Sequence, residues 1–63
     1  MASSYYKDVK KLLIKNNFKK LRQEGSHQFW SNGIYKTTLA TSLDDRNLAN
    51  EIMKQAHIDY RFK

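Results

Sequence analysis

The sequence predicts an α+β fold with the element order α-β-β-β-α, in which two helices cover one face of a three-stranded antiparallel sheet. Apolar residues near both ends of the chain recur at helical spacing, and three short runs between them are rich in aromatic and β-branched residues. Turn-forming residues separate these runs. The chain has 63 residues and contains neither a repeat nor a low-complexity linker, so we expect a single domain over residues 1–63.

A first helix is expected within residues 4–17, where apolar side chains recur every three or four positions. Its apolar face comprises Tyr5, Tyr6, Val9, Leu12 and Leu13. Ser3 or Ser4 can supply the N-cap oxygen. Asn16 and Asn17 favour an end there, because asparagine tolerates the left-handed conformation that commonly follows a helix.

Two aromatic-rich strands are predicted at residues 18–23 and 27–31, with a turn at Glu24-Gly25 between them. Asn32-Gly33 follows, and this dipeptide is the strongest short signal for a β-hairpin. A third strand is therefore expected from Ile34 to Leu39, where the side chains suit a pleated sheet. Together the three strands form an antiparallel meander.

A second helix is expected after Asp44 or Asp45, either of which can provide the N-cap carboxylate. Its apolar face comprises Leu48, Ala49, Ile52, Met53 and Ala56. His57 is expected to end this helix. Residues 58–63 contain apolar side chains without a clear period, and we assign them no element.

Alternation along the second strand places His27 with Phe29 on one face and Gln28 with Trp30 on the other. One of the two aromatic rings is therefore expected in the core beneath the helices. The other is expected to be exposed, where it can stack on RNA bases or contact a protein partner, and we favour the protein contact. The sequence leaves open which ring is which.

The net charge of +6 resides in one half of the chain. Residues 1–36 contain eight Lys and Arg against two Asp and Glu, whereas residues 37–63 contain four of each kind. Basic residues interleaved with aromatic ones are typical of a nucleic-acid-binding surface, which we expect the first helix and first strand to form together. A lysine face that serves only solubility is the alternative.

Composition excludes several kinds of function. The chain has no cysteine, which excludes disulfides, a cysteine zinc site and a thiol nucleophile. Its two histidines lack metal-binding spacing and no glycine-rich phosphate loop is present, so we expect no metal, no cofactor and no nucleotide hydrolysis. The longest apolar run is Leu12-Leu13-Ile14, too short for a membrane span, and we expect a cytoplasmic protein with no membrane partner.

Residues 17–28 read Asn-Phe-Lys-Lys-Leu-Arg-Gln-Glu-Gly-Ser-His-Gln, and this stretch resembles the hallmark of HicA toxins. In that family a helix ends, an aromatic residue follows, and a strand runs into Arg-Gln-x-Gly-Ser-His. The segment from Ile52 to Ala56 is also similar to the family's closing helix. The resemblance covers nearly the whole chain, since HicA proteins are about this long and share the α-β-β-β-α order.

What the resemblance implies is a double-stranded-RNA-binding-like fold in the toxin component of a type II toxin–antitoxin system. HicA toxins are translation-independent mRNA interferases, which are metal-independent endoribonucleases held inactive by a HicB antitoxin. His27 matches the position of the family's catalytic histidine. The implied partners are mRNA and a HicB-like antitoxin, and we expect the free chain to be a monomer.

Histidine suits RNA cleavage, because the 2′-hydroxyl can attack the adjacent phosphorus once a base removes its proton. Imidazole transfers protons at neutral pH, and positive side chains stabilise charge on the phosphate. We expect His27 to act as the general acid or base. The RNA-binding residues are expected to be nearby cations and the turn before the histidine: Lys19, Lys20, Arg22, Gly25, Ser26 and Lys36. Ser26 is not expected to be a nucleophile working with His27, since adjacent strand residues point to opposite faces.

Three positions depart from the family's pattern. Gln28 replaces a second histidine of many relatives, Leu39-Ala40-Thr41-Ser42 replaces a Val-Pro-His-like segment, and His57 replaces a glycine after the last helix. The missing imidazoles leave the catalytic partner of His27 unnamed and favour an alternative, a non-catalytic RNA-binding module of the same fold. A third hypothesis is a structural or phage-encoded interaction protein in which Gly-Ser-His is incidental.

Overall fold

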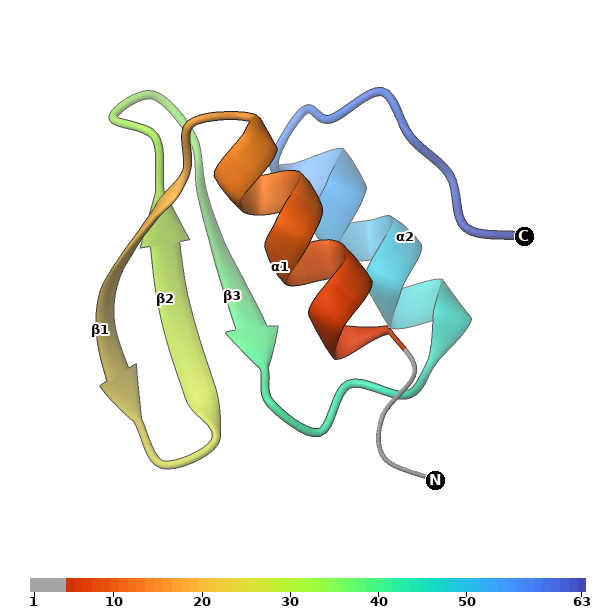
Figure 1. The fold of residues 1–63 in the computed structure, drawn as a ribbon, viewed down its shortest axis with the longest axis horizontal. Helices are drawn as coiled ribbons and strands as arrows, with labels where there is room; N and C mark the ends of the chain where they lie inside the picture. The colour runs from red at the N-terminus through yellow and green to blue at the C-terminus, as the bar shows by residue number, and fades with distance from the viewer. Residues whose placement is uncertain (1–4) are drawn as a thin grey trace.

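The structure, a computed structural model, describes residues 5–63 and confirms the predicted α-β-β-β-α order (Figure 1). The elements are α1 (Tyr6–Lys15), β1 (Lys19–Glu24), β2 (His27–Ser31), β3 (Lys36–Ala40) and α2 (Arg46–Gln55). The three strands pair antiparallel in the order β1-β2-β3, so β2 is central. The α+β fold class is confirmed.

Helix α1 is shorter than the predicted range. Its N-cap is Tyr5, which makes no side-chain cap hydrogen bond, and the expected caps Ser3 and Ser4 lie outside the described residues. The predicted stop is confirmed, because Asn17 adopts a φ of +68°. The side chain of Asn16 also donates to the carbonyl oxygen of Leu12 at 2.8 Å, which satisfies one of the free carbonyls at the helix end.

Strand β1 begins and ends one residue later than predicted. Phe18 is not part of the strand but is buried in the core, and Glu24 is the last strand residue. The turn to β2 is formed by Gly25 and Ser26, with Gly25 at a φ of +61°. A β-bulge at Leu21 shifts the register within β1. Lys20 pairs with Trp30 and Arg22 with the adjacent Phe29, so Leu21 has no partner in β2.

The hairpin between β2 and β3 is longer than the predicted Asn-Gly turn, and the expected strand start at Ile34 is wrong. The side-chain oxygen of Asn32 accepts from the backbone N–H groups of Ile34 and Tyr35, at 2.9 and 2.7 Å. These two bonds form a side-chain-closed turn over residues 32–35. Ile34 is consequently 78% exposed at the hairpin tip, and β3 begins at Lys36.

Helix α2 is capped by Asp45, whose carboxylate accepts from the backbone N–H of Asn47 at 2.8 Å. The structure thus chooses between the two predicted caps. The helix ends at Gln55 and His57 follows with a φ of +56°, as expected for the residue that ends it. Leu48, predicted as part of the apolar face, is instead 55% exposed.

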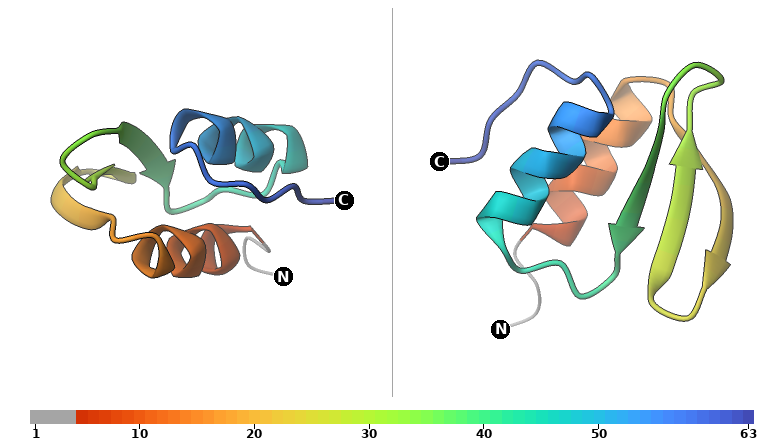
Figure 2. Two further views of the ribbon diagram at one scale, coloured as in Figure 1. Left: turned by 90° about the horizontal axis from the view of Figure 1, so that it is seen from above. Right: turned by 180° about the vertical axis from the view of Figure 1, so that it is seen from behind.

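The helices contact each other and both contact β3, which leaves one face of the sheet open (Figure 2). On β2 and β3 the residues that point toward the helices are buried: Gln28, Trp30, Thr37 and Leu39. We call the opposite surface the open face; it carries His27 and Phe29 of β2 and Lys36 and Thr38 of β3. The alternation also settles the two aromatic rings, because Trp30 is buried and Phe29 is half-buried on the open face.

The C-terminal segment, to which the sequence assigned no element, closes the core. Phe62 is 7% exposed and its ring lies edge-on to that of Tyr5, with centroids 5.5 Å apart. The side chain of Asn50 on α2 holds the backbone of Phe62 by two hydrogen bonds, accepting from its N–H at 2.6 Å and donating to its carbonyl oxygen at 3.0 Å. No helix within residues 5–63 is long and apolar enough to cross a membrane.

Candidate active site

His27 is the first residue of β2 and lies exposed on the open face. The tight turn at Gly25 and Ser26 delivers it there, directly after β1. Among residues 5–63 no group hydrogen-bonds the imidazole of His27. The ring is therefore available to a ligand from solvent.

A carboxylate and a guanidinium lie beside His27 on the open face. Glu24 is the cross-strand partner of His27, and such pairs place their Cβ atoms roughly 5 Å apart. Glu24 forms an ion pair with Arg22 at 3.0 Å. The guanidinium of Arg22 in turn lies over the ring of Phe29, with its central carbon 4.7 Å from the centroid. Arg22 is thus held in place over the sheet by an ion pair and a cation–π contact.

His27 opens onto a groove between the open face and α2, because α2 lies along β3 at the edge of the sheet. This part of the groove has a volume of about 300 Å³. The sheet contributes His27, Thr38 and Ala40, and the far wall consists of Leu43, Leu48, Glu51, Ile52 and Gln55. The exposed Leu48 therefore lines the groove instead of the core.

The groove continues along β3 toward Lys36. A second hollow of about 440 Å³ shares Thr38 and Gln55 with the first, so the two adjoin along β3. Its remaining lining residues are Leu21, Phe29, Trp30, Lys36 and Thr37. We call the two together the β3–α2 groove. It has an imidazole at one end and a lysine ammonium at the other.

The bulge at Leu21 divides the cations that were expected to form a single surface with the first helix. Lys19 and Arg22 oppose Ser31 and Phe29, which places both on the open face, where Lys36 also lies. Lys20 instead opposes the buried Trp30 and so points to the helix side. In a regular strand Lys20 and Arg22 would share a face. The expectation of one continuous basic surface is therefore wrong.

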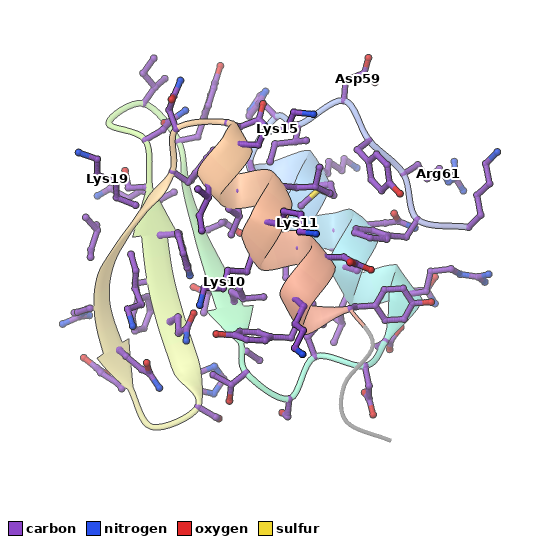
Figure 3. All side chains as sticks on the ribbon, in the orientation of Figure 1. Lys10, Lys11, Lys15, Lys19, Asp59 and Arg61 are labelled. Atoms are coloured by element: carbon purple, nitrogen blue, oxygen red, sulfur yellow. The ribbon has the colours of Figure 1, made fainter. Side chains whose placement is uncertain are left out.

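The lysines of α1 make up the second basic surface, on the helix side. Lys7, Lys10, Lys11 and Lys15 are all exposed. Figure 3 shows Lys10, Lys11 and Lys15 along α1, away from the sheet's open face. This surface cannot contact a ligand in the groove without the ligand passing around an edge of the sheet.

The two turn residues expected to bind RNA have different surroundings. A Cβ atom added at Gly25 would meet no atom within 4 Å, so the space beside this backbone is open to an approaching phosphate. The carbonyl oxygen of Ser26 accepts from the backbone N–H of Thr41 at 2.8 Å. This bond ties the turn to the end of β3 and fixes the position of His27.

Gln28 has no place in the site, although many HicA toxins carry a histidine at the matching position. Its side chain is buried on the helix side, where it donates to the hydroxyl of Tyr6 at 2.8 Å. Its amide oxygen accepts from the indole N–H of Trp30 at 3.2 Å. Gln28 is therefore a structural residue of the core.

Glu24, Glu51 and Gln55 lie near His27 in the structure but are not among the residues predicted from the sequence. A signal for the two helical residues existed, because Leu48, Glu51 and Gln55 recur at helical spacing and share one side of α2. Nothing in that spacing shows that this side borders His27. The structure brings the imidazole into one groove with the Glu51 carboxylate.

Within the part of the chain that the structure describes, no three His, Asp or Glu side chains gather where they could hold a metal ion. No protein-family model, curated protein or solved structure matches the chain. The resemblance to HicA toxins and to double-stranded-RNA-binding domains thus stays a prediction from residues 17–28 and the element order.

Proposed function

We propose that this protein is a metal-independent endoribonuclease that acts as the toxin of a HicA-like toxin–antitoxin pair. The observation that carries the proposal is the placement of His27, exposed on the open face at one end of a groove whose other end holds Lys36. Such chemistry requires an imidazole that the substrate can reach and positive side chains that can bind the phosphate backbone. The Gly-Ser-His motif at residues 25–27 adds the family resemblance.

The reaction needs only RNA and protein groups. The 2′-hydroxyl oxygen attacks the adjacent phosphorus, the bond from phosphorus to the 5′-oxygen breaks, and the products are a 2′,3′-cyclic phosphate and a 5′-hydroxyl. His27 takes the proton from the 2′-hydroxyl or gives one to the leaving 5′-oxygen. Glu24, its cross-strand partner, and Glu51, across the groove, are the candidates to orient the imidazole or to transfer the second proton.

The cations of the open face would stabilise the negative charge that develops on the phosphate. Lys36 lines the groove. Lys19 and Lys36 both pair with Ser31, one from each side of β2. Arg22 is held over Phe29 and can turn its remaining N–H groups to a phosphate. A HicB-like antitoxin that covers the open face would block His27 and neutralise these cations together.

The test is cleavage of a labelled RNA by the purified chain in the presence of EDTA, with the ends of the products identified. We expect wild type to release products with 2′,3′-cyclic phosphate ends. His27→Ala and His27→Gln should each lower the rate by about 10²-fold or more, since proton transfer contributes that much. Both should stay folded by circular dichroism, because the side chain is exposed.

Arg61→Ala is the matched control, as it removes an exposed cation from the C-terminal segment, remote from the open face (Figure 3). It should cleave within twofold of wild type. Growth arrest on induction should follow the same order, with arrest and mRNA loss for wild type and Arg61→Ala only. A folded His27→Ala chain that still cleaves RNA at the wild-type rate would contradict the assignment.

A non-catalytic RNA-binding module is the second candidate, and one observation favours it. Among the described residues none hydrogen-bonds His27, whereas catalytic histidines are commonly oriented by a partner. Salt-sensitive RNA binding without any cleavage by wild type would establish this function instead.

A further inference from the structure

Tyr35 and His57 form an exposed pair of stacked rings outside the site described above. Their ring centroids are 3.8 Å apart and the planes differ by 17°. Tyr35 is 36% exposed, and His57 is also exposed. The pair joins the β2–β3 hairpin to the end of α2.

Both ends of this stack are fixed by the backbone. Asn32 binds Tyr35 twice, since its side-chain oxygen accepts from the Tyr35 N–H at 2.7 Å and its own N–H donates to the Tyr35 carbonyl at 3.2 Å. The N–H of His57 donates to the carbonyl of Lys54 at 3.2 Å. The rings are therefore held in position before any ligand arrives.

The backbone conformation of His57 indicates that its side chain has a role. Its φ of +56° is one that glycine adopts without steric cost, so ending the helix alone would favour glycine. A residue held in a sparsely populated conformation points to a role for the side chain that is retained there. The ring's observed contact is the stack with Tyr35.

Both residues of the stack are close in sequence to residues that line the Lys36 end of the β3–α2 groove. Lys36 follows Tyr35 in sequence, Gln55 precedes His57 by two residues, and both line the groove. The hydroxyl of Thr37 donates to the side-chain oxygen of Gln55 at 3.0 Å, which joins β3 to α2 at this point. Tyr35 lies about 16 Å along the strand from Ala40, the residue that pairs with His27.

We propose that the Tyr35–His57 stack is a nucleobase-binding subsite. It would stack on a base of the single-stranded RNA whose phosphates lie in the groove and whose cleaved bond lies at His27. This inference rests on the proposed function and adds where a second part of the substrate is held. Stacking on a ring tolerates any base, so the subsite anchors the strand without selecting its sequence.

The experiment measures the affinity of a fluorescent single-stranded RNA by anisotropy, in the His27→Ala background so that the RNA is not cut. Tyr35→Ala should weaken binding roughly 5- to 150-fold, the range found for loss of one base stack. Tyr35→Phe should bind as the parent does. Tyr60→Ala is the matched control, because Tyr60 is a 50% exposed tyrosine on the C-terminal segment, and it should change the affinity less than twofold.

Two further measurements separate base stacking from charge and from folding. The slope of affinity against salt should be the same with and without Tyr35→Ala, since no phosphate contact is lost. RNA with abasic sites should bind the parent as weakly as normal RNA binds Tyr35→Ala. His57→Gly should weaken RNA binding while remaining at least as stable as the parent, because glycine relieves the backbone strain.

The outcomes distinguish the two proposals. If the His27→Ala parent binds RNA and adding Tyr35→Ala changes that affinity by less than twofold, the subsite alone is overturned. The subsite is also overturned if Tyr35→Ala lowers only the stability of the chain. An absence of RNA binding by the folded wild-type chain and by the parent would overturn the proposed function, and the subsite with it.

Discussion

At the scale of single residues, Gln28 shows how one side chain can belong to the core at a position where a catalytic group was conceivable. Adjacent residues on a strand point to opposite faces, so Gln28 points toward the helices because His27 lies on the open face. The buried amide then has to satisfy its polar groups, which it does through Tyr6 and Trp30. Its contribution is to stability.

We expect Gln28→Leu to lower the free energy of unfolding by about 1–3 kcal/mol, because the indole N–H of Trp30 is left buried without its acceptor. For a domain of this size the melting temperature should fall by roughly 5–20 °C. Asn47→Leu makes a similar amide-to-leucine change at an exposed position of α2 and should alter the free energy by less than about 0.5 kcal/mol. Urea and thermal unfolding followed by circular dichroism check both; equal effects of the two substitutions would refute the structural role of Gln28.

At the scale of elements, the bulge in β1 decides which cations can act together. Without it, Lys20 would join Arg22 on the open face. With it, Lys20 lies on the helix side, and its ammonium is 3.4 Å from the side-chain oxygen of Gln23. The cations of the open face are therefore Lys19, Arg22 and Lys36. A bulge also protects the exposed edge of a sheet from pairing with another chain.

We expect Lys36→Gln to weaken RNA binding by roughly tenfold, the effect of losing one charge-assisted hydrogen bond. The slope of log affinity against log salt should fall by about 0.7, as for one lost phosphate contact with a single strand. Lys20→Gln removes the same charge from the other face and should change the affinity less than threefold. Anisotropy titrations at several salt concentrations measure both, and a larger loss from Lys20→Gln would move the RNA path from the groove to the helix side.

At the scale of the whole molecule, a chain of 63 residues has a thin core, and its two ends have to complete it. Tyr5, next to α1, and Phe62, near the C-terminus, meet edge to edge. The two hydrogen bonds from Asn50 hold the C-terminal segment against α2. Since α2 also forms the far wall of the groove, the segment that stabilises this helix supports the site from a distance.

We expect Phe62→Ala to lower the free energy of unfolding by about 3 kcal/mol or more, because it deletes a buried ring from this core. Arg61→Ala, an exposed neighbour, should change it by less than about 0.5 kcal/mol. Urea unfolding gives both values. A Phe62→Ala chain as stable as wild type would show that the C-terminal segment does not contribute to the core.

The sequence by itself determined the features that local physics encodes. Helical and strand periodicities predicted the element order and, except for Leu48, the inward residues of the two helices. The residue type at Asn17 predicted the helix end, because asparagine tolerates a positive φ. The sequence also placed His27 beside a tight turn, on the face opposite Gln28.

Only the tertiary structure decided the rest. It buried Trp30 instead of Phe29, set the bulge that separates Lys20 from Arg22, turned Leu48 toward a groove and drew Phe62 into the core. Each outcome depends on which surface of a distant element a side chain meets. The spacing of residues along the chain does not specify contacts between distant elements. The groove that contains His27, Glu51 and Lys36 therefore exists only once α2 has packed along β3.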